Sequence, residues 1–197
     1  AISEAQGKAI PWLRETYQDI GQHIRTQSVA HADETRYFRG NEQRWLWLLA
    51  IPDALYLMTH FSRGKAAANE LLGPFGGVLV TDHYAGYNDY PQAQRQLCWA
   101  HLTRHFQAMS ERSGFSGKVG GRLLLAANAV FRTRHRLANR QITQQCHDRR
   151  QGRLRAWFGY WLALGATGVA DKRTTRQCTH LQKDEMMCWT FLDDPRI

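Results

Sequence analysis

Apolar residues near the start of the chain recur every three or four positions, which is the spacing of one face of a helix. These residues are Ile10, Leu13, Tyr17, Ile20 and Ile24. The pattern predicts a lead-in helix over residues 1–27 that packs its apolar face on a sheet.

Three strands are predicted next, because short apolar runs alternate with turn residues. The first strand begins at Val29 with β-branched and small side chains. Gly40-Asn41 is typical of a hairpin turn, and it leads to a return strand over residues 44–51. A third strand is predicted over residues 54–61. We therefore expect an antiparallel meander.

The pattern changes after the meander. Residues 65–72 indicate a helix that Gly73-Pro74 ends, and residues 76–82 form a short apolar run typical of a buried parallel strand. One more short strand is expected over residues 94–98. A strand reached through a helical crossover commonly lies beside the first strand. We therefore predict an α/β fold with a mixed five-stranded sheet, three strands antiparallel and the others parallel, flanked by helices.

The remainder of the chain has helical periodicity. Helices are predicted from about residue 116, over residues 143–164 and over residues 174–191. We divide the chain into the lead-in helix (1–27), an α/β core (28–110) and an all-helical region (111–197).

The composition indicates a folded, basic protein. The chain has 26 Lys and Arg residues against 17 Asp and Glu residues, giving a net charge of +9 and a pI near 9.8. Such a surplus favours a polyanion, most often nucleic acid, although an inert basic surface is the competing interpretation. No apolar run is long enough to span a membrane. Four scattered cysteines indicate reduced thiols in the cytoplasm. The chain has no initiator Met and stops inside a turn, so we expect a fragment of a longer polypeptide.

Two carboxylates end predicted central strands. His31, Asp33 and Thr35 share one face of the first strand, and Asp82 ends the fourth. If these strands are neighbours, Asp33 and Asp82 come within reach of one another and repel unless a positive charge lies between them. A divalent cation with oxygen ligands, Mg²⁺ or Mn²⁺, would serve, and phosphoryl transfer is the chemistry that suits it. The alternative is two unrelated acids that face solvent.

Three motifs carry a resemblance to a known family. They are His-Ala-Asp-Glu-Thr at 31–35, Val-Leu-Val-Thr-Asp-His-Tyr-Ala-Gly-Tyr at 78–87 and Gln-Leu-Cys-Trp-Ala-His-Leu-Thr-Arg-His-Phe at 96–106. Their order and spacing resemble those of the transposases of the IS66 insertion-sequence family.

The resemblance implies a ribonuclease-H-like catalytic core of the DDE type, with the all-helical region as an insertion. It also implies transposition of double-stranded DNA with two divalent metal ions, by a bacterial enzyme that acts near the nucleoid and as a multimer on paired ends. Asp33 and Asp82 would match the first two acids. The third, a Glu in an Asn-Asn-Ala-Ala-Glu-Arg-like motif, is absent, because residues 189–197 resemble the segment that comes just before it.

The Cys98-x-x-His101 element matches one that follows the second acid in several transposase superfamilies. It is only half of a zinc site, and the remaining Cys and His residues have no standard spacing, so zinc is not favoured. His31, Cys98 and His101 are instead candidates for active-site support. For His101 a hydrogen bond to a DNA phosphate is the alternative.

Basic residues supply candidate DNA contacts, with a solvated helix face as the competing interpretation for each. The candidates are Arg63, Arg104, Arg132, Arg136, Arg149 and Arg153. Trp189 is kept as a further candidate because it lies near the missing Glu, although its aromatic neighbours favour a place in a helical core.

Three functions remain open. The first is a transposase catalytic core that lacks its third acid. The second is a DNA-binding remnant without chemistry. The third is a stand-alone nuclease that recruits Asp193, Asp194 or Glu185 as its third ligand.

Overall fold

The computed structural model describes residues 2–194 and 196–197, and the side chains of residues 2, 3, 5 and 6 are outside that description. The chain forms two compact units. The first comprises the residues up to Arg95 together with Arg196–Ile197, and the second begins at Gln96. Each unit is described by itself.

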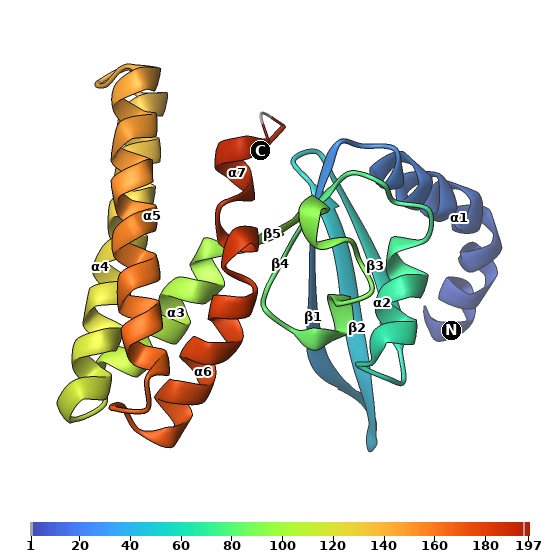
Figure 1. Ribbon diagram of the computed structural model, residues 1–197. Helices are drawn as coiled ribbons and strands as arrows, with labels where there is room; N and C mark the ends of the chain where they lie inside the picture. Colours follow the sequence, from blue (N-terminus) through green and yellow to red (C-terminus); the bar gives the residue numbers. More distant parts are fainter. Residues whose placement is uncertain (1, 195) are drawn as a thin grey trace. The chain divides into compact units, whose positions relative to one another are not determined.

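The sheet has the predicted mixed topology (Figure 1). β1 (Val29–Arg39), β2 (Glu42–Ile51) and β3 (Ala54–His60) form an antiparallel meander, and β4 (Val78–Thr81) lies parallel to β1. With β5 (Arg95–Leu97) the strand order is β3-β2-β1-β4-β5. This is a ribonuclease-H-like topology, so the predicted fold class is confirmed.

Glycines make the two turns that define this topology. Gly40 has a φ of 61° in the hairpin between β1 and β2, where a side chain would be strained. Gly73 has a φ of 50° and ends the crossover helix α2 (Lys65–Leu72), after which the chain returns as β4. Both turns were predicted from the sequence.

One face of the sheet is covered by α2 and by α1 (Ile2–Arg25), whose apolar residues share a core with β1, β2 and β4. Its centre is built from the following fully buried side chains: Ile24, Ala30, Trp47, Leu49, Leu71 and Leu79. Ala30 and Ala32 point into this core while His31 does not, as strand alternation predicts.

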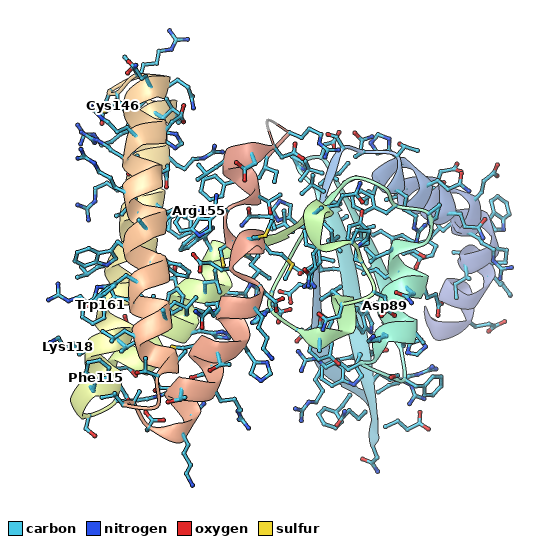
Figure 2. All side chains as sticks on the ribbon, in the orientation of Figure 1. Asp89, Phe115, Lys118, Cys146, Arg155 and Trp161 are labelled. Atoms are coloured by element: carbon cyan, nitrogen blue, oxygen red, sulfur yellow. The ribbon has the colours of Figure 1, made fainter. Side chains whose placement is uncertain are left out.

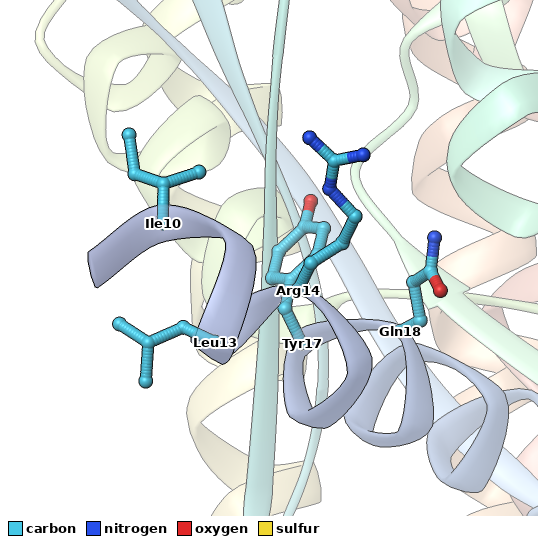
Figure 3. Close-up of a pocket in the computed structure, with 5 residues that line it drawn as sticks. All are labelled: Ile10, Leu13, Arg14, Tyr17 and Gln18. Atoms are coloured by element: carbon cyan, nitrogen blue, oxygen red, sulfur yellow. The ribbon is translucent and has the colours of Figure 1, made fainter. Parts of the chain in front are cut away.

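The predicted apolar face of α1 is fully buried only at Ile24. Tyr17 stacks on Tyr56 with ring centroids 4.7 Å apart, and its hydroxyl donates to the Leu57 carbonyl at 2.8 Å, yet Tyr17 is still 41% exposed. Ile10 and Leu13 are exposed and, with Tyr17, line an open pocket of about 550 Å³ (Figure 3).

The second unit is all helical. Its helices are α3 (Trp99–Ser110), α4 (Gly114–Ala138), α5 (Gln144–Ala166), α6 (Lys172–Lys183) and the short α7 (Thr190–Asp193). Aromatic side chains form its core, with Trp189 packed edge-on against Trp99 and Phe158 at centroid distances of 5.0 and 5.7 Å. The predicted helix over residues 174–191 is interrupted, because Asp184 ends α6 and a single 3₁₀ turn, Glu185–Cys188, follows. No helix in the described part of the chain is long and apolar enough to cross a membrane.

Candidate catalytic site

Asp33 lies within β1, and Asp82 directly follows β4, the strand next to β1 in the sheet. In the parallel pairing of β1 with β4, His31 lies opposite Val80. Each acid follows two residues later, Asp33 within β1 and Asp82 directly after the end of β4. The two segments that carry the predicted carboxylates are therefore neighbours in the sheet, and adjacent strands are about 4.8 Å apart.

Backbone amides hold both carboxylates. The Glu34 N–H donates to Asp33 Oδ1 at 2.9 Å, and the Tyr84 N–H donates to Asp82 Oδ1 at 2.9 Å. Both aspartates are half-buried. These bonds limit the rotation of each side chain, so both acids keep a defined direction.

Glu34 points to the opposite face from Asp33, and its side chain is completely buried. Arg63 donates to Glu34 Oε1 through Nε at 2.8 Å and Nη2 at 2.7 Å. The Tyr87 hydroxyl donates to Oε2 at 2.7 Å. Burial raises the pKa of Glu34, an effect that the bonds from Tyr87 and Arg63 reduce and the nearby charge of Asp82 reinforces.

These contacts tie the loop after β4 to the rest of the sheet. The Arg63 guanidinium lies over the rings of Tyr84 and Trp45, at 4.0 and 5.0 Å. The Tyr84 hydroxyl donates to the Arg63 carbonyl at 2.8 Å. Tyr84 and Tyr87 both follow Asp82 within one short loop, so the Glu34–Arg63 pair fixes the segment that carries the second acid.

A buried arginine supports the same strand end. Arg95 is only 1% exposed, and its Nη2 donates to Thr81 Oγ1 at 3.2 Å and to the Asp82 carbonyl at 3.5 Å. Its Nη1 donates to Asn88 Oδ1 at 3.2 Å. These bonds hold the backbone at the end of β4, where Asp82 follows.

Sequence reasoning missed Glu34, Tyr87 and Arg95 as parts of the site. For Glu34 a signal was present, since strand alternation puts it on the same face as Ala30 and Ala32. An acid on a buried face requires a partner. For Tyr87 and Arg95 no local pattern distinguishes a site residue from a core residue.

The other candidates for active-site support, His31, Cys98 and His101, belong to different elements. His31 shares the face of Asp33, and partial burial lowers its pKa. Cys98 and His101 belong to the second unit, at the start of α3, where both are half-buried. Across residues 2–194 and 196–197, no three His, Cys, Asp or Glu side chains gather in a way that could hold a metal ion.

The candidate DNA-binding residues differ in the solvent exposure of their side chains. Arg63 is engaged by Glu34 and its side chain is 40% exposed. Arg104 and Arg149 are exposed on α3 and α5, whereas Arg132, Arg136 and Arg153 line one groove between α4 and α5. Trp189 has no exposed surface, so its indole is part of the helical core.

Comparison with known proteins gives one match. A family profile described as "Transposase IS66 family" matches residues 1–197, the whole chain. No curated protein and no solved structure matches. The strand order and the family match agree with one another. The chain belongs to the IS66 family of transposases.

Proposed function

We propose that this chain carries two of the carboxylates that cleave and join DNA in a DDE transposase, Asp33 and Asp82. The observation that supports the proposal most directly is the parallel pairing of β1 with β4, the neighbouring strands that carry or precede the two acids. The substrate is double-stranded DNA at the element's ends and at the target, in the bacterial cytoplasm. The active species is a multimer on paired ends.

The donor set fits a divalent metal. Asp33 and Asp82 supply carboxylate oxygens, which Mg²⁺ and Mn²⁺ prefer, and close carboxylates of like charge need a cation between them. When bound, the metal would activate the attacking hydroxyl group and stabilise the leaving oxygen. The amides of Glu34 and Tyr84 orient the two carboxylates. Glu34, Arg63 and Tyr87 hold the loop that carries Asp82.

The test is DNA strand cleavage by Asp33→Asn and Asp82→Asn, each made in this chain and in any longer product of its reading frame. Asp53→Asn is the matched control, because Asp53 is an exposed acid in the turn between β2 and β3. We expect both site variants to lose at least about a thousandfold in cleavage rate and to keep their affinity for DNA. The control keeps both properties. Retained cleavage in either site variant would contradict the proposal.

The same assay separates the alternative functions. Salt-sensitive DNA binding by every form of the protein, without metal-dependent cleavage by any of them, would indicate a DNA-binding remnant. Cleavage by this chain alone that is lost in Glu185→Gln, Asp193→Asn or Asp194→Asn would indicate a stand-alone nuclease.

A further inference from the structure

A basic groove runs between α4 and α5, in the helical unit. Its lining residues recur at intervals of three, four and seven positions on both helices, so each helix presents one face to it. They are Ala129, Arg132, Thr133 and Arg136 from α4, and Arg150, Arg153, Leu154 and Trp157 from α5. The groove has a volume of about 380 Å³.

The positive charge of the whole chain is concentrated on these two helices. Of 26 Lys and Arg residues, nine lie on α4 and α5, against one of the 17 Asp and Glu residues. The rest of the chain therefore has 17 basic and 16 acidic residues and is almost neutral. Figure 2 shows the side chains of both helices, with nitrogen atoms gathered around the end of α5 that carries Cys146.

The groove arginines are not neutralised within the protein. Among the residues that the structure describes, none of the four guanidinium groups takes part in an ion pair. The single acid of the two helices, Asp148, does not line the groove and is bonded instead by Gln144 and His147. Four like charges in one groove repel one another, so an anionic partner stabilises this arrangement.

An apolar hollow and one further arginine extend this face along the helices. Leu125, Ala126, Leu154 and Trp157 line an adjoining hollow of about 250 Å³. Beyond it, Arg122 lies over Trp157 and Trp161, at 5.8 and 5.5 Å from the ring centroids. From Arg122 to Arg136 the face is about 21 Å long at 1.5 Å per helical residue. At about 3.4 Å per nucleotide, this length matches roughly six phosphates of one DNA strand.

We infer that this α4/α5 face is a binding site for the DNA backbone, formed by Arg132, Arg136, Arg150 and Arg153. A guanidinium group donates two parallel hydrogen bonds to one phosphate and remains charged at any physiological pH. The groove is also lined by Ala129 and Leu154, whose apolar side chains form no hydrogen bonds with DNA bases. The face therefore binds duplex DNA irrespective of its sequence. The inference rests on the proposed function only in taking DNA as the partner.

The test compares two double variants of the full chain by fluorescence anisotropy on a labelled duplex of scrambled sequence. Arg132→Gln with Arg153→Gln removes one groove arginine from each helix. Lys172→Gln with Arg176→Gln removes the same charge from exposed positions on α6. Both variants also carry Asp33→Asn, so that no cleavage disturbs the measurement. Thermal melting by circular dichroism checks that both remain folded.

We expect the groove variant to bind about tenfold more weakly than the parent at moderate salt, and the slope of log K against log salt to fall by about two. The α6 variant changes affinity less than about twofold by the same argument. Arg132→Lys with Arg153→Lys keeps the charges and loses the bidentate bonds, so its affinity falls between those of the parent and the groove variant.

Equal loss in the groove and α6 variants would overturn the inference, because only net charge would then matter. A groove variant that binds the duplex as the parent does but no longer binds polyglutamate would also overturn it, since the groove would then take an acidic protein. Neither result concerns Asp33 or Asp82. Cleavage that persists in the Asp33→Asn protein would instead count against the proposed function.

Discussion

Glu34 is an acid on the core-facing side of a strand, and its environment explains why the fold tolerates it. Its two oxygens accept three hydrogen bonds, two from Arg63 and one from Tyr87. Burying a carboxylate without such partners would cost several kcal/mol. Alternation along β1 predicts the face on which Glu34 lies. It does not predict the partners, which are 29 and 53 residues away in the sequence.

The raised pKa of Glu34 predicts a pH-dependent stability. Because the folded protein holds a proton at Glu34 to higher pH than the unfolded chain does, this residue makes stability fall as pH rises through the raised pKa. Glu34→Gln removes that titration. The unfolding free energy of the native protein, minus that of Glu34→Gln, should therefore decrease with rising pH and then level off. Urea unfolding across the acidic range measures it, and an increase with pH would contradict the assignment.

Glu34→Ala removes the acceptor as well as the charge. The buried Tyr87 hydroxyl then has no partner from Glu34, and Arg63 loses its ion pair, so we expect a loss of about 2–4 kcal/mol in unfolding free energy. Glu42→Ala is the control, because Glu42 is 66% exposed in its pair with the half-buried Arg44, and ion pairs of exposed carboxylates contribute less than about 1 kcal/mol. Equal effects of the two substitutions, measured by urea unfolding, would show that Glu34 is not held as described.

At the scale of elements, two adjacent glycines in α4 have opposite surroundings. A Cβ on Gly120 would overlap the backbone of Met109 and Ser110 in α3, so the two helices approach closely at Gly120. A Cβ on Gly121 would meet nothing within 4 Å. The two positions test whether α3 and α4 cross as described.

We expect Gly120→Ala to destabilise the protein by about 1–3 kcal/mol, through overpacking at the crossing. Gly121→Ala, in the same helix, should stabilise it by up to about 1 kcal/mol, because alanine has the higher helix propensity. The melting temperatures of both variants, measured by calorimetry, test this prediction. A stabilising Gly120→Ala would mean that the helices do not touch there.

Helices and strands were well predicted where local patterns determine them. The meander, the crossover helix and the parallel fourth strand follow from turn residues and from apolar runs. The predictions were wrong where the packing between elements, not the local pattern, determines the structure. Alternation and periodicity do not reveal that Ile10 and Leu13 stay exposed, nor that Asp184 ends α6 before the buried Trp189. The three-part division with a boundary near residue 110 remains a prediction, whereas the two compact units divide between Arg95 and Gln96.

At the scale of the whole molecule, the net positive charge is unevenly distributed along the chain. Asp33 and Asp82 belong to the sheet unit, and nearly all of the net positive charge belongs to α4 and α5. Sequence reasoning selected Asp33 and Asp82 by expecting each to end a central strand. This is correct for Asp82, which directly follows β4, and wrong for Asp33, because β1 continues to Arg39. The same reasoning named three of the four groove arginines but also Arg149, since sequence alone does not show which side of a helix faces its neighbour.

The most direct test of the paired acids is oxidative cutting of the polypeptide by bound iron. Fe²⁺ takes the place of Mg²⁺ at oxygen ligands, and with ascorbate and peroxide it cuts the backbone nearest to it. Mass spectrometry locates the cuts. If Asp33 and Asp82 hold one ion between them, cuts appear beside both residues, Mg²⁺ suppresses them, and Asp33→Asn weakens both together. Cuts beside Asp82 that persist unchanged in Asp33→Asn would contradict a shared site.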